Sequence, residues 1–378
     1  MLWLIITIGF SLFFVSYRIF GKVFNPFFVM AFPVYFSLYG GNIVRDLSFP
    51  VEQNLYTDAI ILVYLISILI GSILGFYTLK AMFKNHGNID TLDLVVNENF
   101  YPYLIIIVLA CVAMLYPEFI KYPFSFNGFR QFYHESRATS GMGLYFYLLG
   151  ISIPILVLLS FRKDRTILAL IFFISMIFIG KKQGFLTAAM MVLAYIDLCT
   201  VRRISGYAIP ILLFIVSMLT IQVLFSSADL PISQLISGYF DYYINLSYTL
   251  EWLSDNNYKF NGAILLTSLW FFLPRSLYPD KPELYGTVLI HEQIYPDFLA
   301  LGYTPGIFSP IAAPMADFGI WFLIVVTIIK SAGIAALYFY FLRSRLFVIF
   351  LLYVSIFDLM YILLFLPIIF LFTRRRGY

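Results

Sequence analysis

Charged residues are scarce in this chain, and so are cysteine and histidine. Only 12% of its 378 residues are charged, whereas 62% are hydrophobic and 20% are aromatic. A water-soluble protein of this size needs a polar surface to cover its core, so the composition predicts an integral membrane protein. The net charge of +4 is small, and the basic residues lie between hydrophobic runs, which argues against a nucleic-acid-binding face.

Metal-binding and soluble-enzyme motifs are missing as well. Cys111 and Cys199 both lie in apolar runs, as small core residues do. His86, His134 and His291 are too scattered along the chain to predict a metal site. The sequence has no Walker A, HExxH, GxSxG or paired CxxC pattern. We therefore expect a function that uses no metal and no cofactor.

Long apolar runs dominate the sequence. A helix needs roughly 20 apolar residues to cross the hydrocarbon core. Runs near this length cover residues 2–20, 24–40, 57–79, 100–116, 142–161, 166–180, 184–200, 206–225, 314–342 and 346–372. They predict an all-α polytopic membrane protein with about ten or eleven transmembrane helices, in one membrane domain over residues 1–378. The first run has no leading positive charge and no small-residue cleavage site, so we expect a retained span.

Lysine and arginine predict the orientation, because short cytoplasmic loops are enriched in them. The short basic connections contain Arg18, Lys22, Lys80, Lys84, Arg162, Lys163, Arg165, Arg202, Arg203, Arg343 and Arg345. With these in the cytoplasm, the N-terminus is outside. Residues 41–56, 117–141, 180–183 and 226–313 are then outside too, and 226–313 is the large outer loop.

The last apolar run leaves two topologies open. A single span over 346–372 puts Arg374, Arg375 and Arg376 outside, against the charge rule. A hairpin of two short helices turning near Asp358 returns them to the cytoplasm, although no Gly, Pro or Asn marks the turn. We favour the hairpin because of the charge rule.

The large outer loop predicts two helices and a stiff turn. Apolar residues at helical spacing over 230–245 predict an amphipathic helix on the membrane surface, with Asp229 as its N-cap. Residues 263–273 are too short to span, and we interpret them as a partly inserted helix broken by Pro274. The next residues, through Pro282, are rich in proline, so the turn is stiff and holds Arg275 and Lys281 at the membrane surface.

Cations and aromatics gather in the outer loops. The other outer cations are Lys121, Arg130, Arg137, Lys181 and Lys182, of which the last two lie between Gly180 and Gly184. They either meet lipid phosphates or bind a lipid-linked phosphate or pyrophosphate at the outer leaflet. The outer tyrosines, phenylalanines and Trp252 are typical of an interfacial belt, and some are alternatively platforms for sugar rings.

Three acidic or basic residues interrupt the apolar runs near the C-terminus. Lys330 lies mid-span, Asp317 lies near the outer end of the same run, and Asp358 is central in the last run. Charges at this depth are costly, so a structural ion pair between Lys330 and Asp358 is our first interpretation.

This pattern resembles the O-antigen polymerase family, the Wzy-type oligosaccharide repeat-unit polymerases. Three motifs carry the resemblance: Pro274–Arg275 to Pro279–Asp280–Lys281–Pro282, Gly302 to Gly306 leading through Pro310 to Asp317–Phe318–Gly319, and Gly180 to Gly184. In the third, lysine stands where relatives often have arginine. The resemblance implies a metal-independent, GT-C-like glycosyltransferase of the bacterial inner membrane. Its substrates are oligosaccharide units on undecaprenyl pyrophosphate, and a chain-length regulator is a possible partner.

The implied reaction assigns roles to these residues. Arg275 and Lys281 stabilise the departing pyrophosphate, with help from Arg130, Arg137, Lys181 and Lys182. The acceptor hydroxyl needs a base, for which the candidates are His291, Glu292, Asp280 and Asp317. Asp280 alternatively orients Lys281. A lipid-linked oligosaccharide flippase and an O-antigen ligase are the competing functions, although the chain shows no internal repeat of the kind that transporters have.

Overall fold

The computed structural model describes most of the chain as helices. It describes residues 2–40, 54–85, 94–96, 100–125, 128–129, 131–133, 136, 142–162, 165–176, 182–199, 242–272, 278–280, 282, 284–300, 306–340 and 373–375. Within these residues the fold is all-α apart from one antiparallel pair of three-residue strands, β1 (Leu94–Val96) and β2 (Thr373–Arg375). The all-α prediction is therefore confirmed for this part of the chain.

Long apolar helices form most of the structure. In chain order they are α1 (Leu2–Phe20), α2 (Pro26–Val34) with the π-helix η1 (Tyr35–Gly40), α4 (Leu55–Asn85), α5 (Phe100–Phe119), α7 (Gly143–Arg162), α8 (Thr166–Ser175), α9 (Lys182–Cys199) and α17 (Ile320–Tyr340). Shorter helices follow α9 and precede α17: α12 (Tyr242–Asp255), α13 (Ala263–Thr267), the 3₁₀-helix η2 (Ser268–Phe272), α14 (Val288–Ile294), α15 (Pro296–Ala300) and α16 (Ser309–Phe318).

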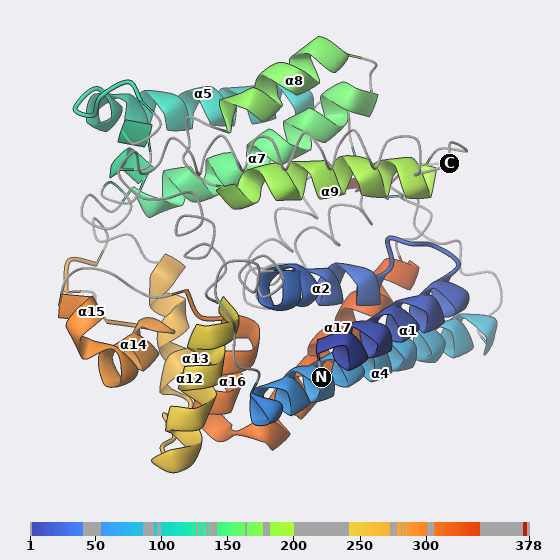
Figure 1. The fold of residues 1–378 in the computed structure, drawn as a ribbon. Helices are drawn as coiled ribbons and strands as arrows, with labels where there is room; N and C mark the ends of the chain where they lie inside the picture. The colour runs from blue at the N-terminus through green and yellow to red at the C-terminus, as the bar shows by residue number, and fades with distance from the viewer. Residues whose placement is uncertain are drawn as a thin grey trace.

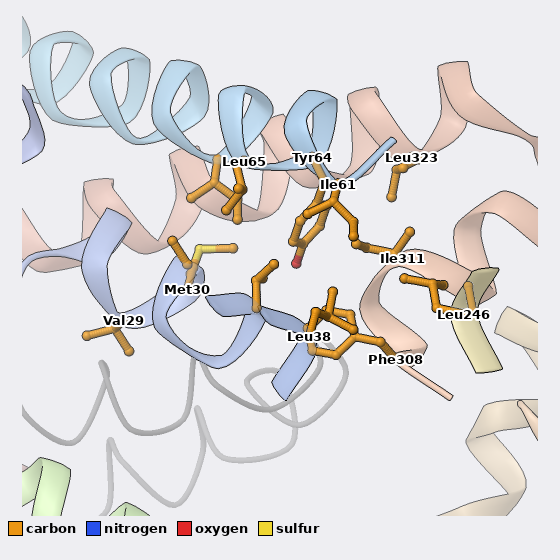
Figure 2. Close-up of a cluster of buried hydrophobic side chains, with 14 of the residues drawn as sticks. Val29, Met30, Leu38, Ile61, Tyr64, Leu65, Leu246, Phe308, Ile311 and Leu323 are labelled. Atoms are coloured by element: carbon orange, nitrogen blue, oxygen red, sulfur yellow. The ribbon is translucent and has the colours of Figure 1, made fainter. Parts of the chain in front are cut away.

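The long helices lie in two groups, with the short helices at one end (Figure 1). Helices α5, α7, α8 and α9 form one group, and α1, α2, α4 and α17 form the other. The second group packs on the short helices through a shared apolar core. Figure 2 shows Leu38, Ile61, Leu246 and Ile311, from four different elements, pointing toward one another in this core. The short helices are thus fixed to the helical bundle by buried apolar contacts.

Three of the described helices are long and apolar enough to cross a membrane: Leu55–Ala81, Tyr101–Phe119 and Ile320–Phe339. Each matches a predicted run. The second of them leaves most of its apolar surface uncovered, with Ile106 and Leu109 about three-fifths exposed at 59% and 61%. Apolar side chains exposed along a whole helix suit a lipid environment better than water. Predicted runs 206–225 and 346–372 lie outside the described residues.

Gly71 and Gly75 let α4 approach α17 closely, in the most extensive helix–helix contact of the described elements. A Cβ atom at Gly71 would collide with Ser331 and Ile328, and one at Gly75 with the backbone carbonyl of Ala332. Small residues four apart are the usual means by which two membrane helices bring their backbones together.

We expect Gly75→Ala to destabilise the fold by about 1–3 kcal/mol, because backbone cannot yield as a flexible side chain can. The measurement is the thermal unfolding of the detergent-solubilised protein. Gly333→Ala on α17 is the matched control, since a Cβ there meets nothing within 4 Å and should cost no stability. Equal unfolding temperatures for the two variants would show that α4 and α17 do not approach each other this closely.

The predicted run 314–342 is two helices, which corrects the expectation of one span. Helix α16 ends at Phe318, and Gly319 breaks the chain with φ of 85°, a left-handed conformation that glycine adopts without strain. Helix α17 then begins at Ile320. Asp317 therefore belongs to the short helices and not to the candidate span. Lys330 is half-buried in the middle of α17, while Asp358 lies outside the described residues.

Candidate functional site: the α12–α16 assembly

The helices between α12 and α16 form one assembly, which we call the α12–α16 assembly (residues 242–318 as described). It contains all the described residues of the predicted outer loop and lies at the end of α4 where that helix begins (Figure 1). The predicted helix at residues 263–273 is confirmed as α13 with η2, which together are too short to span. The predicted amphipathic helix over 230–245 lies mostly outside the described residues, and α12 begins at Tyr242.

A hydrogen-bonded network fastens α12 to the first turn of α4. Asn54 caps α4 by accepting from the backbone N–H groups of Tyr56 (2.9 Å) and Thr57 (3.1 Å). The backbone N–H of Asn54 donates to the Tyr243 hydroxyl oxygen at 3.1 Å, and the Tyr243 hydroxyl donates to Asp58 Oδ1 at 3.0 Å. Burial raises the pKa of Tyr243, so this hydroxyl remains a donor at neutral pH.

Asp58 is a buried carboxylate that the sequence analysis did not select. It is 2% exposed, and its Oδ1 also accepts from the Tyr39 hydroxyl of the π-helix at 3.3 Å. Its Oδ2 makes no hydrogen bond within the described part of the chain. The signal that could have found it is an acidic residue at the start of an apolar run, in the first turn of the predicted helix, because charges within spans are rare and functional by default.

Asp317 holds the start of α13. Its Oδ1 accepts from the backbone N–H groups of Gly262 and Ile264, both at 3.1 Å, and its Oδ2 accepts from that of Leu265 at 2.9 Å. Burial raises the pKa of Asp317, and the three N–H groups oppose the rise. At 1% exposure, this carboxylate cannot meet a substrate hydroxyl unless α13 and α16 separate. The geometry gives Asp317 a positioning role, and its role as a base stays a prediction.

The loop that carries the predicted cations is closed at its base. The Thr267 hydroxyl oxygen accepts from the backbone N–H of Gly286 at 2.8 Å, which brings the two ends of the 268–285 segment together. Within the segment, the Trp270 and Tyr278 rings stack at 5.1 Å with an interplanar angle of 24°. Asp317 fixes α13, and α13 carries Thr267, so the start of this loop is anchored to the bundle.

Asn245 joins three parts of the assembly. Its side-chain amide donates to the Gly306 carbonyl at 3.0 Å, and its own carbonyl accepts from the Tyr295 hydroxyl at 3.3 Å. Gly306 belongs to one of the motifs that carry the family resemblance. The His291 ring lies 6.1 Å from the Tyr295 ring. Sequence segments about 50–60 residues apart therefore meet at this turn of α12.

His291 is buried at 5% exposure, and its Nδ1 lies 3.0 Å from the Thr287 carbonyl oxygen. A carbonyl can only accept, so Nδ1 is the donor in this contact. Asp280 and Glu292 are exposed. The structure brings His291 and Asp317 into the same assembly but shows no contact between them among the described residues.

Most of the cations that were predicted to bind pyrophosphate lie outside the described residues. Arg130, Arg137, Lys181, Arg275 and Lys281 lie outside the described residues, and Lys182 is described only as the first residue of α9. The described residues contain no group of three or more His, Cys, Asp or Glu that could hold a metal ion. Comparison with protein-family models, curated proteins and solved structures found no match to this chain.

Proposed function

We propose that the protein is a polytopic membrane glycosyltransferase of the GT-C-like kind. It polymerises oligosaccharide units carried on undecaprenyl pyrophosphate, at the outer face of the bacterial cytoplasmic membrane. The observation that carries the proposal is the α12–α16 assembly itself. An ordered group of helices lies at one end of an apolar bundle and closes the base of the loop that contains Arg275 and Lys281.

Contacts at the ends of the helices support the polytopic topology. On the predicted cytoplasmic side, the Lys22 ammonium donates to the Asp197 carbonyl at 3.0 Å, and the Tyr101 hydroxyl lies 2.9 Å from the Ser160 hydroxyl. On the predicted outer side, Asn54 contacts Tyr243, and the Phe132 ring lies 5.1 Å from the Phe146 ring. Each of these contacts joins chain segments that the charge rule assigns to the same side of the membrane.

The strand pair supports a cytoplasmic C-terminus. Val95 of β1 pairs with Arg374 of β2, and β1 follows the basic end of α4 that contains Lys80 and Lys84. This favours the hairpin interpretation of residues 346–372. We expect a C-terminal reporter that is active only in the cytoplasm to be active, and a periplasmic reporter at the same position to be silent. The reverse result would support a single span.

In the proposed reaction, the acceptor hydroxyl attacks the anomeric carbon of the donor saccharide. The new glycosidic bond forms as the bond from that carbon to the pyrophosphate oxygen breaks, and undecaprenyl pyrophosphate leaves with the bonding electrons. Arg275 and Lys281 stabilise its growing negative charge. Arg130, Arg137, Lys181 and Lys182 assist in binding it.

The proton of the acceptor hydroxyl goes to a base. Among the predicted candidates, His291 suits this role when its ring is neutral, because Nδ1–H then faces Thr287 and Nε2 is the accepting nitrogen. Glu292 and Asp280 are exposed alternatives. His291 is 5% exposed, so, like Asp317, it reaches a substrate hydroxyl only when the helices around it separate.

Deletion of the gene tests this function. A polymerase is required to join units, so the deletion strain should accumulate single-repeat glycolipid on the outer leaflet and lack long polymer. Single units retained in the inner leaflet would instead support a flippase. Long polymer left on undecaprenyl pyrophosphate would support an O-antigen ligase. Unchanged lipid-linked saccharides would contradict all three.

A further inference from the structure

We propose that the exposed face of Tyr248 on α12 is a stacking platform for a sugar ring of the lipid-linked saccharide. This inference rests on the proposed function and assigns a saccharide subsite within the α12–α16 assembly. The subsite would accept the apolar face of a pyranose ring.

Tyr248 is half exposed, and its ring contacts the ring of Tyr295. Its side chain is 50% exposed, and its ring lies 5.5 Å from the Tyr295 ring at an interplanar angle of 42°. Tyr295 is held in turn, because its hydroxyl donates to the Asn245 carbonyl at 3.3 Å. A rigid tyrosine supplies a large contact area with little loss of side-chain entropy on binding.

The charged neighbour of Tyr248 on α12 is acidic: Glu251 is exposed and accepts a hydrogen bond from the Asn54 side-chain amide. Glu251 lies three residues further on the same face of α12, and Glu292 and Asp297 are exposed on α14 and α15. Among the described residues of the assembly, Lys259 is the one lysine or arginine. Carboxylates repel lipid phosphates, but they accept hydrogen bonds from sugar hydroxyls.

A second tyrosine provides the contrast. Tyr103 on α5 is 58% exposed, similar to Tyr248, but its exposed neighbours on that helix include Ile106 and Leu109. Such a tyrosine suits the membrane interface, where an aromatic ring lies at headgroup level. The two residues therefore have the same side chain and similar exposure but opposite surroundings.

The position of Tyr248 fits an acceptor or donor saccharide close to the candidate base, His291. The Tyr295 ring, which contacts Tyr248, also lies beside the ring of His291. His291 is the candidate base, and its Nδ1 faces the Thr287 carbonyl. Asn245, one turn earlier on α12, holds Gly306 and Tyr295 and so fixes the surface on both sides. A sugar stacked here would lie beside Glu251 on α12 and next to Tyr295, which directly follows α14.

The test is the kinetics of Tyr248→Ala, with Tyr103→Ala as the matched control. The probe is the single-repeat glycolipid extracted from the deletion strain, and the full-length protein is assayed in detergent. We expect Tyr248→Ala to raise the KM for this glycolipid about 3- to 10-fold while kcat changes little, because stacking that is equally strong in the ground state and the transition state contributes to binding alone. Tyr248→Phe should retain nearly normal KM, and Tyr103→Ala should leave it unchanged.

Three outcomes would overturn the platform. They are an unchanged KM for Tyr248→Ala, an equal rise for Tyr103→Ala, and binding of the wild-type protein to anionic lipid vesicles that Tyr248→Ala abolishes. The last two would assign Tyr248 to the lipid surface. If Tyr248→Ala fails to fold, Tyr248→Leu takes its place, and a normal KM for that variant would also contradict stacking. Failure of the polymerase proposal is recognised separately, because the deletion strain would then contain no accumulated single-repeat glycolipid.

Discussion

Arg275→Ala is expected to abolish polymer while single-repeat glycolipid persists in the membrane. The proposed reaction develops negative charge on the departing pyrophosphate, and a fixed guanidinium is the donor best suited to bind it bidentately. Removal of one such donor typically lowers kcat about 100- to 1,000-fold, which would eliminate the ladder of chain lengths. Arg275→Lys should fail too if the contact is bidentate, because an ammonium group presents no planar fork.

Polymer length, separated by gel electrophoresis and normalised to protein in the membrane, is the measurement. Lys259→Ala is the matched control, since Lys259 is an exposed cation of the same assembly with no predicted role. We expect a normal ladder from that variant. A normal ladder from Arg275→Ala would contradict the mechanism, and equal loss from Lys259→Ala would indicate a general charge effect.

Asp317→Ala is expected to destabilise the α12–α16 assembly strongly and to lower activity with it. The substitution leaves two buried backbone N–H groups, those of Gly262 and Ile264, and the partly buried N–H of Leu265 without their acceptor. Each orphaned group costs about 1–3 kcal/mol, so the total exceeds the effect of an ordinary helix cap. The measurements are the unfolding temperature in detergent and the polymer made per folded molecule.

Asp317→Asn separates positioning from catalysis. An amide retains one acceptor oxygen but places its NH₂ group near a backbone N–H, so we expect reduced stability and partial activity. A catalytic base would give the opposite pattern, with normal unfolding and no polymer. Asp255→Ala, at an exposed carboxylate that ends α12, is the control and should affect neither property.

Much of the architecture follows from local composition. The runs at 57–79, 100–116 and 314–342 each contain a helix long enough to span. The length of an apolar run is a local property of the sequence, and this length decides whether a helix can cross the hydrocarbon core. The short helix that begins at Ala263 was predictable from the length of its apolar run, which is too short to span. The break at Gly319 was not predicted, because an isolated glycine within an apolar run is usually tolerated as helix.

By itself, the sequence determined that the chain is apolar and helical, and that short basic connections recur between its apolar runs. Only the tertiary structure decided what Asp58 and Asp317 contact, since both are held by groups that lie far away along the chain. Tyr243 is 185 residues from Asp58, and the N–H groups that bind Asp317 are 52 to 55 residues before it. Hydropathy and charge are sums over neighbouring residues, whereas a buried carboxylate is defined by the donors that folding brings to it.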